Sequence, residues 1–188
     1  IRAQDRMRLA PGDTVFVVYS LGKNAATTGV SGTAGTDEQV NLNGNPVFVS
    51  DKLYASLPGQ KIQEYPLDYL ADQFFITKDN YLWVVTRSYT LYVFLLHPEK
   101  PGHYFELIKK FNEKELPKLS PRAITVDLNG NVWIGNRDQG LFCFYLDKNR
   151  NILSWQQITT KNGLSDNTIT YLYCDDKGTI WSGTTSGL

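Results

Sequence analysis

The sequence has few residues of the kinds that bind metals or form disulfides. Only two cysteines and two histidines occur among 188 residues, and there is no C-x-x-C motif. Cys143 and Cys174 each lie in an apolar stretch, which favours small buried side chains, with a disulfide as the alternative. His97 and His103 lie in a proline-flanked turn, where we expect solvent exposure rather than a metal site. We therefore predict no metal and no cofactor.

The sequence also lacks an excess of charge of one sign and a long hydrophobic run. Lys plus Arg and Asp plus Glu are both 19, so no positive field favours a nucleic acid partner through counterion release. The longest strongly apolar run, near residues 15–18, is far shorter than the roughly 20 residues of a membrane-spanning helix. No signal peptide is recognisable, but Ile1 is not an initiator Met, so we expect a processed or shortened N-terminus.

Aromatic residues, by contrast, are abundant at 13%, and some of them recur at a regular interval. The stretch DLNGNVW, which ends at Trp133, returns as DDKGTIW at Trp181, and a weaker copy, TKDNYLW, ends at Trp83. The three tryptophans are 50 and 48 residues apart, close to the ~40 to 50 residue period of propeller blades. The repeat therefore predicts an all-β fold, a β-propeller.

Each repeat is predicted to form four antiparallel strands. In the clearest one, alternation of apolar and polar residues predicts strands at 123–127, 132–136, 141–146 and 152–158. Gly130, like Gly178 in the next repeat, is expected to supply the positive φ of the first hairpin turn. Trp83, Trp133 and Trp181 are expected to fill the wedge between neighbouring sheets, a structural role. Residues 104–111 have helical spacing, but the repeat register predicts a fourth strand there, followed by a short helical turn within 109–118.

The repeats predict one domain, a partial propeller of about four blades. We place the blades at about 41–70, 71–120, 121–167 and 168–188, the last incomplete, while residues 1–40 match the pattern poorly and 21–36 resemble a long loop. Six to eight blades of ~48 residues would need about 290 to 380 residues. We therefore expect a truncated fragment, or else an open array whose exposed edges self-associate.

The last repeat resembles a known family. Residues 162–188, NGLSDNTITYLYCDDKGTIWSGTTSGL, are similar to the two-component regulator propeller repeat, with its Gly-Leu-Ser-x-Asn loop and its Gly-x-Ile-Trp-x-Gly-Thr strand at fixed separation. The resemblance is close in the last blade, good in the blade that begins near Ala123 and loose in the blade near Phe74. It implies the periplasmic sensor region of a hybrid histidine kinase, which recognises a carbohydrate and signals across the inner membrane. The kinase module itself is not in this chain.

Strand direction selects the loops that would contact a ligand. Connections from the second to the third strand, and from the fourth strand to the next blade, emerge on one face; they are 87–89, 114–122, 137–139, 161–167 and 184–186. Their Arg, Tyr, Asp and Asn side chains suit the hydroxyls, carboxylates or sulfates of an oligosaccharide. The predicted ligand-binding residues are Arg87, Tyr89, Arg122, Arg137 and Asp138, and ordinary solvated loop residues are the alternative.

Two other classes of function stay open. A propeller-type carbohydrate-active enzyme would need two positioned carboxylates, and the loop acids Glu113, Glu115, Asp138 and Asp166 show no distinctive spacing. We therefore predict no catalytic residue. A protein-interaction scaffold would hold a partner or dimerise a receptor, and a large apolar patch on the blade rims would favour it.

Overall fold

The structure is a computed structural model that describes residues 29–33, 39–42, 45–49, 52–55, 63–97, 99–100 and 102–187, with side chains from residue 52 onward. All the regular elements in these ranges are β-strands. Among these residues there is no helix of the length and apolarity that a membrane crossing requires. The predicted all-β class is confirmed.

The strands form four antiparallel sheets. The first contains β2 (Gln39–Leu42), β3 (Asn45–Val49), β4 (Lys52–Ala55) and β5 (Gln63–Pro66). The second contains β6 (Ala71–Thr77), β7 (Tyr81–Thr86), β8 (Leu91–Leu96) and β9 (Phe105–Phe111), and β1 (Gly29–Thr33) is paired with β6. The third contains β10 (Pro121–Val126), β11 (Val132–Asn136), β12 (Leu141–Leu146) and β13 (Ile152–Ile158), and the fourth contains β14 (Ile169–Cys174) and β15 (Ile180–Thr184).

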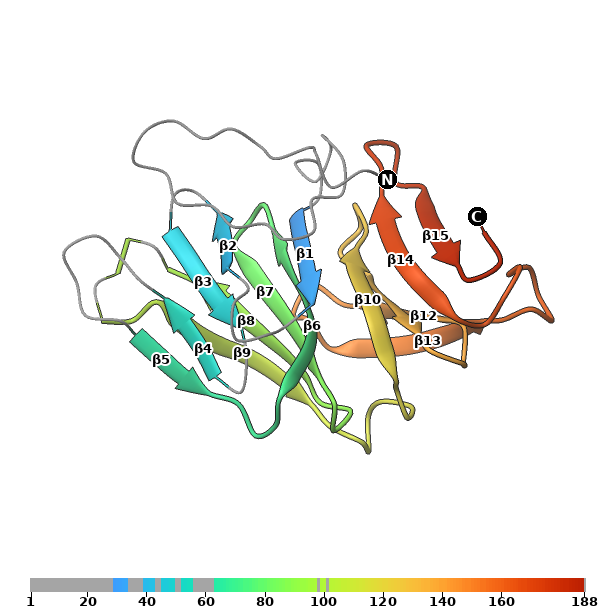
Figure 1. Cartoon of the computed structure of the whole chain (residues 1–188). Coiled ribbons are helices and arrows are strands. Elements are labelled where there is room, and N and C mark those ends of the chain that lie inside the picture. The colour runs from blue at the N-terminus through green and yellow to red at the C-terminus, as the bar shows by residue number, and fades with distance from the viewer. Residues whose placement is uncertain are drawn as a thin grey trace.

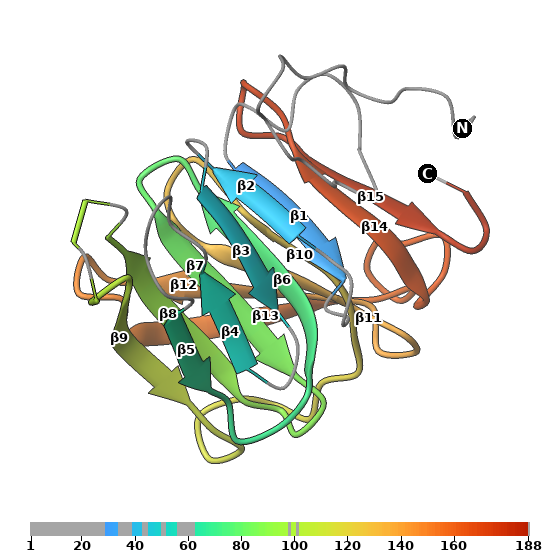
Figure 2. The same ribbon diagram turned by 60° about the vertical axis from the view of Figure 1, so that its left-hand side comes forward.

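The sheets are arranged radially. The first strands of successive sheets contact one another, β6 with β10 and β10 with β14, whereas the fourth strands β9 and β13 lie away from this junction (Figures 1 and 2). Sheets that converge on their first strands and spread towards their last are the blades of a propeller. The described strands therefore form a partial β-propeller, as the repeat predicted.

Apolar side chains fill the wedge between each pair of neighbouring sheets. One cluster lies between the first and second sheets and contains Phe74 and Phe94. The next lies between the second and third sheets and contains Trp83 and Phe142. A smaller one joins the third and fourth sheets around Ile169. A large ring buries 150–250 Å², which at roughly 25 cal/mol/Å² corresponds to about 4–6 kcal/mol of transfer free energy, so these rings are the main attachment between blades.

The predicted strands of the third sheet agree with the structure. Those at 132–136, 141–146 and 152–158 have the expected bounds, and the first strand starts two residues early, at Pro121. Residues 105–111 form strand β9, so the repeat register prevails over the helical spacing. A single helical turn follows, in which the Leu116 N–H donates to the Asn112 carbonyl at 3.0 Å. The expectation of a loop throughout 21–36 is wrong where β1 forms.

The three repeated tryptophans occupy the same register position on their sheets. Trp83, Trp133 and Trp181 each lie on the second strand, opposite Phe75, Thr125 and Tyr173 of the first. Their surroundings differ: Trp83 is fully buried, Trp133 packs against the cluster around Ile169, and Trp181 is 50% exposed. In the turns that precede Trp133 and Trp181, Gly130 and Gly178 have φ of 83° and 82°.

The cysteines and one of the histidines are buried. Cys143 and Cys174 are both free and buried, and burial raises the pKa of the Cys143 thiol to about 11. His97 is less exposed than expected: its side chain is 12% exposed, and its ring nitrogens contact Glu99 at 3.2 Å and Glu106 at 2.5 Å. His103 is exposed. Within the described ranges, His, Cys, Asp and Glu form no group of three that could hold a metal ion.

Candidate ligand-binding face

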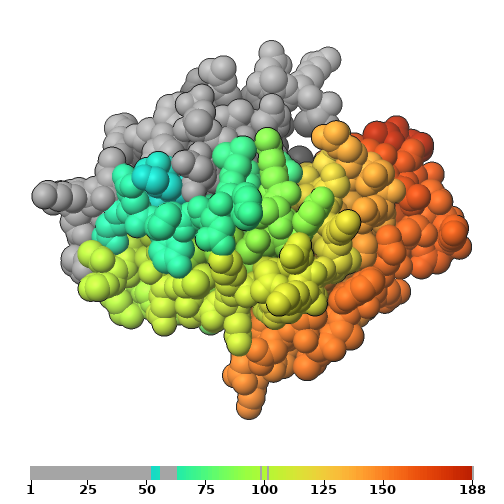
Figure 3. All heavy atoms as spheres, turned by 90° about the horizontal axis from the view of Figure 1, so that it is seen from below, coloured from blue at the N-terminus to red at the C-terminus, as the bar shows by residue number. Residues whose placement is uncertain are grey.

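The two kinds of connection singled out from the sequence meet at one end of the sheets. In the second, third and fourth sheets, the residue that follows the second strand has an N–H that bonds the carbonyl just before the first strand of the same sheet. Arg87 bonds Leu70 at 3.1 Å and Arg137 bonds Ser120 at 2.9 Å, and the third such pair is Thr185 and Thr168 at 3.2 Å. Figure 3 looks at this end, where the green, yellow and orange segments adjoin. We refer to it below as the loop face.

A β-bulge interrupts the first strand of three successive sheets near the loop face. The register shifts between Ala71 and Gln73 in β6, and equivalent shifts occur in β10 and β14. Bulges re-aim one side chain out of the regular alternation. The extra residues are Asp72, Arg122 and Thr170; Arg122 and Thr170 are exposed and Asp72 partly so, although the residue before each of them is buried.

Among the predicted ligand-binding residues, Arg87 forms an ion pair with the first of these bulge residues. The Arg87 Nε lies 3.9 Å from the Asp72 Oδ1, with exposed side-chain fractions of 65% and 26%. Burial raises the pKa of Asp72 above its ordinary value, and the guanidinium groups of Arg87, Arg137 and Arg122 act in the opposite direction. The structure thus places one partly buried carboxylate within the field of three arginines that come from two blades.

The other two predicted residues have different surroundings. Tyr89 has a positive φ of 64°, and its partly buried ring packs against the apolar cluster between the second and third sheets. Asp138 follows Arg137 and is exposed. The ring of Tyr89 thus contributes to packing between blades, and Asp138 adds a solvated carboxylate to the loop face.

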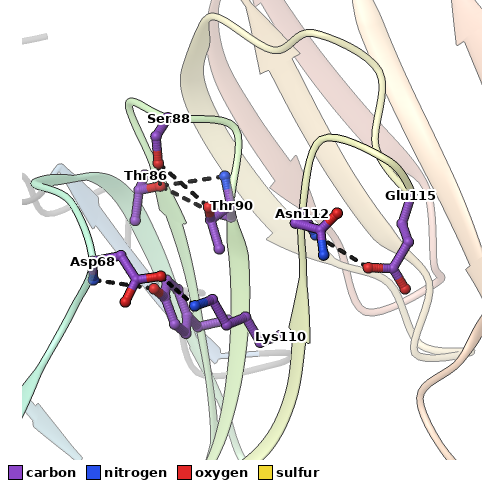
Figure 4. Close-up of polar contacts among 8 residues, drawn as sticks. Asp68, Thr86, Ser88, Thr90, Lys110, Asn112 and Glu115 are labelled. Carbon is purple, nitrogen blue, oxygen red and sulfur yellow. Dashed lines mark hydrogen bonds and ion pairs between the residues drawn. The ribbon is translucent and has the colours of Figure 1, made fainter.

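Short polar contacts hold the connections of the loop face in place (Figure 4). In the β7–β8 connection, the Ser88 hydroxyl lies 3.0 Å from that of Thr86 and 3.3 Å from that of Thr90. In the β9–β10 connection, the Asn112 N–H donates to the Glu115 Oε2 at 3.2 Å. The neighbouring β5–β6 connection is held by an ion pair of Asp68 with Lys110 and by a bond from the Asp68 N–H to the Tyr92 hydroxyl.

The Gly-Leu-Ser-x-Asn loop between β13 and β14 is held by its own side chains. The Asn162 Oδ1 accepts the Thr159 N–H at 2.5 Å, and the Asn167 Oδ1 accepts the Thr160 N–H at 2.8 Å. The Ser165 hydroxyl lies 2.8 Å from that of Thr184. These polar groups are occupied in shaping the turn, which favours a structural role for this motif.

Sequence reasoning missed Asp72. The repeat register contains the signal, because Asp72, Arg122 and Thr170 each stand eleven residues before their tryptophan, while Arg87 and Arg137 stand four after. Asp72 lies within a predicted blade but not in a predicted loop.

A hollow at the opposite end of the sheets, at the β8–β9 connection, is lined by His97, Glu99, Lys100, His103, Phe105 and Glu106.

Comparison with known proteins gives a family match in the last blade. Residues 163–186, which span the end of the β13–β14 loop, β14 and β15, match the family model described as two component regulator propeller. The comparison with curated protein sequences gave no match.

A solved structure with a TM-score above 0.5 shares the fold. The extracellular domain of a hybrid two component system from B. thetaiotaomicron is 18% identical, with a TM-score of 0.54, and the match covers 88% of this chain and 22% of that one. A second such domain from the same organism is 20% identical over 82% of this chain and 20% of that one, with a TM-score of 0.47. The WD40 β-propeller domain of Doa1 is 10% identical over 73% and 45%, with a TM-score of 0.46.

The chain therefore spans about a fifth of the length of the two bacterial domains. The radial sheets make this chain a partial β-propeller, and its residues 163–186 match the model of the two component regulator propeller.

Proposed function

We propose that this chain is part of the ligand-sensing propeller of a bacterial two-component regulator, that it recognises a carbohydrate in the periplasm, and that it signals to a kinase module. The family match in the last blade supports the regulator assignment. The extracytoplasmic location is supported by the description of the similar bacterial structures as extracellular domains.

The observation that carries the proposal is that three exposed arginines, Arg87, Arg122 and Arg137, lie on the loop face, where Arg87 forms an ion pair with Asp72. Guanidinium groups offer several donors in a fixed plane, which suits the hydroxyl and carboxylate oxygens of a sugar. Hydrolysis of a glycoside would instead use two positioned carboxylates, whereas Asp72 is paired with a cation. Binding without turnover is therefore the function that this chemistry favours.

The test is a panel of neutral and acidic oligosaccharides, screened by the rise in melting temperature that binding to the native state produces. We expect at least one oligosaccharide to bind, and Arg137→Gln to weaken its affinity at least tenfold. The matched control is Lys148→Gln, which removes an exposed cation from the opposite end of the third sheet. Absence of any oligosaccharide binding, or equal affinity of Arg137→Gln and Lys148→Gln for the oligosaccharide, would contradict the proposal. Release of reducing ends from an oligosaccharide would show that the chain is an enzyme rather than a binding domain.

A further inference from the structure

The three bulged blades carry different charges at two equivalent positions on the loop face. The positions are the bulge residue of the first strand and the residue that follows the second strand. The second sheet has Asp72 and Arg87, an ion pair, and the fourth sheet has the uncharged Thr170 and Thr185. The third sheet has Arg122 and Arg137, both exposed. Positive charge is thus concentrated on the middle blade.

The two arginines of the middle blade have no close acidic partner. Among the residues that the structure describes, no carboxylate oxygen lies within 4.0 Å of either guanidinium group, whereas Arg87 has Asp72. The backbone N–H of Arg137 bonds the carbonyl of Ser120, two residues before Arg122, at 2.9 Å. The two like charges therefore stand on adjacent chain segments, and an anion bound by both would relieve their repulsion. A bidentate guanidinium pair also fits the geometry of a carboxylate or a sulfate group.

The backbone beneath these arginines is fixed by a buried side chain. Asn136, fully buried at the end of β11, accepts the Ser120 N–H at 2.7 Å through Oδ1. Its Nδ2 donates to the carbonyl of Ile134 at 3.2 Å and to that of Gly140 at 3.4 Å. One amide thus joins the connection that leads to Arg122 to the connection that begins with Arg137, and such preorganisation lowers the entropic cost of binding.

We propose that Arg122 and Arg137 form an anion subsite, so that the ligand of this face is an acidic glycan held by a carboxylate or sulfate group. This inference rests on the proposed function and narrows its substrate class. Asp72 lies on the neighbouring blade at the same face and forms an ion pair with Arg87, so its negative charge opposes an anion bound there. Removing that carboxylate should therefore strengthen anion binding and leave the binding of a neutral ligand unchanged.

The probes are an oligogalacturonate tetramer and its methyl ester, which has the same sugars without the charges, and a chondroitin sulfate disaccharide with its unsulfated form. Titration calorimetry on the intact protein should give at least tenfold tighter binding of the galacturonate than of its neutral methyl ester, or of the sulfated disaccharide than of its unsulfated form, which keeps only the uronate carboxylate. This advantage should shrink as salt rises. The pair that shows the preference identifies the group as carboxylate or sulfate.

Variants separate a direct role from a structural one. Arg122→Gln and Arg137→Gln should each remove most of the preference for the charged ligand. Asp72→Asn should increase the affinity for the charged ligand about two- to fivefold. Lys148→Gln should change neither the preference nor the affinity. Equal affinity for the two members of each pair would overturn the anion subsite and leave the carbohydrate proposal standing. If inorganic sulfate binds in a way that depends on both arginines, while no oligosaccharide binds, the result would support the subsite and overturn the carbohydrate proposal.

Discussion

The indole N–H of Trp133 donates a hydrogen bond to the Oδ2 of Asp127 at 3.0 Å. The other carboxylate oxygen of Asp127 accepts the backbone N–H of Asn131 at 2.9 Å. Trp181 repeats the arrangement with Asp175, at 2.9 Å. The repeated aspartate thus has two roles: it closes the hairpin turn, and it orients the ring of the tryptophan six residues later.

The first prediction isolates the contribution of this ring contact. Asp147 closes the β12–β13 turn with the same contacts to the residues two and four ahead as Asp127, but without a tryptophan. Asp127→Ala should destabilise the fold more than Asp147→Ala, because a partly buried indole donor loses its acceptor as well; one such bond contributes about 1 kcal/mol. Urea unfolding of both variants measures the difference, and equal losses would show that the indole bond adds nothing.

The second prediction concerns the blade in which this contact is missing. Trp83 is fully buried and its Nε1 has no hydrogen-bond partner, because Thr77 stands where Asp127 and Asp175 stand in the other repeats. The Thr77 hydroxyl already accepts the Tyr81 N–H at 3.0 Å, which either an Asp or an Asn could also do. Only Asp offers a second acceptor oxygen to the indole.

Thr77→Asp should therefore be more stable than Thr77→Asn by about 1 kcal/mol, the value of one added hydrogen bond. Thermal unfolding of the two variants, which are equal in size, makes the comparison. A less stable Asp variant would mean that the cost of burying the carboxylate exceeds the hydrogen bond to Trp83.

The strands of the clearest repeat could be predicted from the sequence because one pattern of alternation, turns and aromatic spacing agrees at every level there. The carboxylate of Asp72 could not, because a bulge changes the direction of one side chain without changing the strand pattern around it. Tyr89 was predicted to bind ligand from its loop position alone, and its packing between blades depends on a neighbour from another sheet. His97 likewise depends on Glu106, nine residues away on the paired strand.

The third prediction explains the glycine that follows the repeated tryptophan. A Cβ on Gly135 would lie 2.7 Å from the Cβ of Ile169 in the next sheet, and closer still to its Cγ2. Gly135→Ala should therefore force β11 and β14 apart and cost about 1–3 kcal/mol, as overpacking does. The double variant Gly135→Ala/Ile169→Ala removes the clash. In calorimetric melting, its stability should therefore lie closer to that of Ile169→Ala alone than the sum of the two single losses predicts. Additive losses would place the strain elsewhere than at this contact.

The fourth prediction is a loss of stability at alkaline pH that depends on a buried phenol. Tyr104 is 2% exposed, within the cluster between the first and second sheets. Burial raises its pKa from 10.0 to about 12, so the folded state keeps the phenolic proton at a pH at which the unfolded chain releases it. Since the native state then binds more protons, stability falls as pH rises from about 10 to 12. Burial likewise raises the pKa of Tyr171 to about 12.

Tyr104→Phe should therefore reduce the alkaline loss of unfolding free energy by about 2–3 kcal/mol, the equivalent of two pH units on one group. Below pH 9 its effect on stability should not vary with pH. Tyr69→Phe is the matched control, because Tyr69 is 58% exposed, and it should leave the pH profile unchanged. Urea denaturation at one-half pH unit steps from pH 8 to 12 measures both variants. Parallel profiles for wild type and Tyr104→Phe would show that this phenol ionises equally readily in the folded and unfolded states.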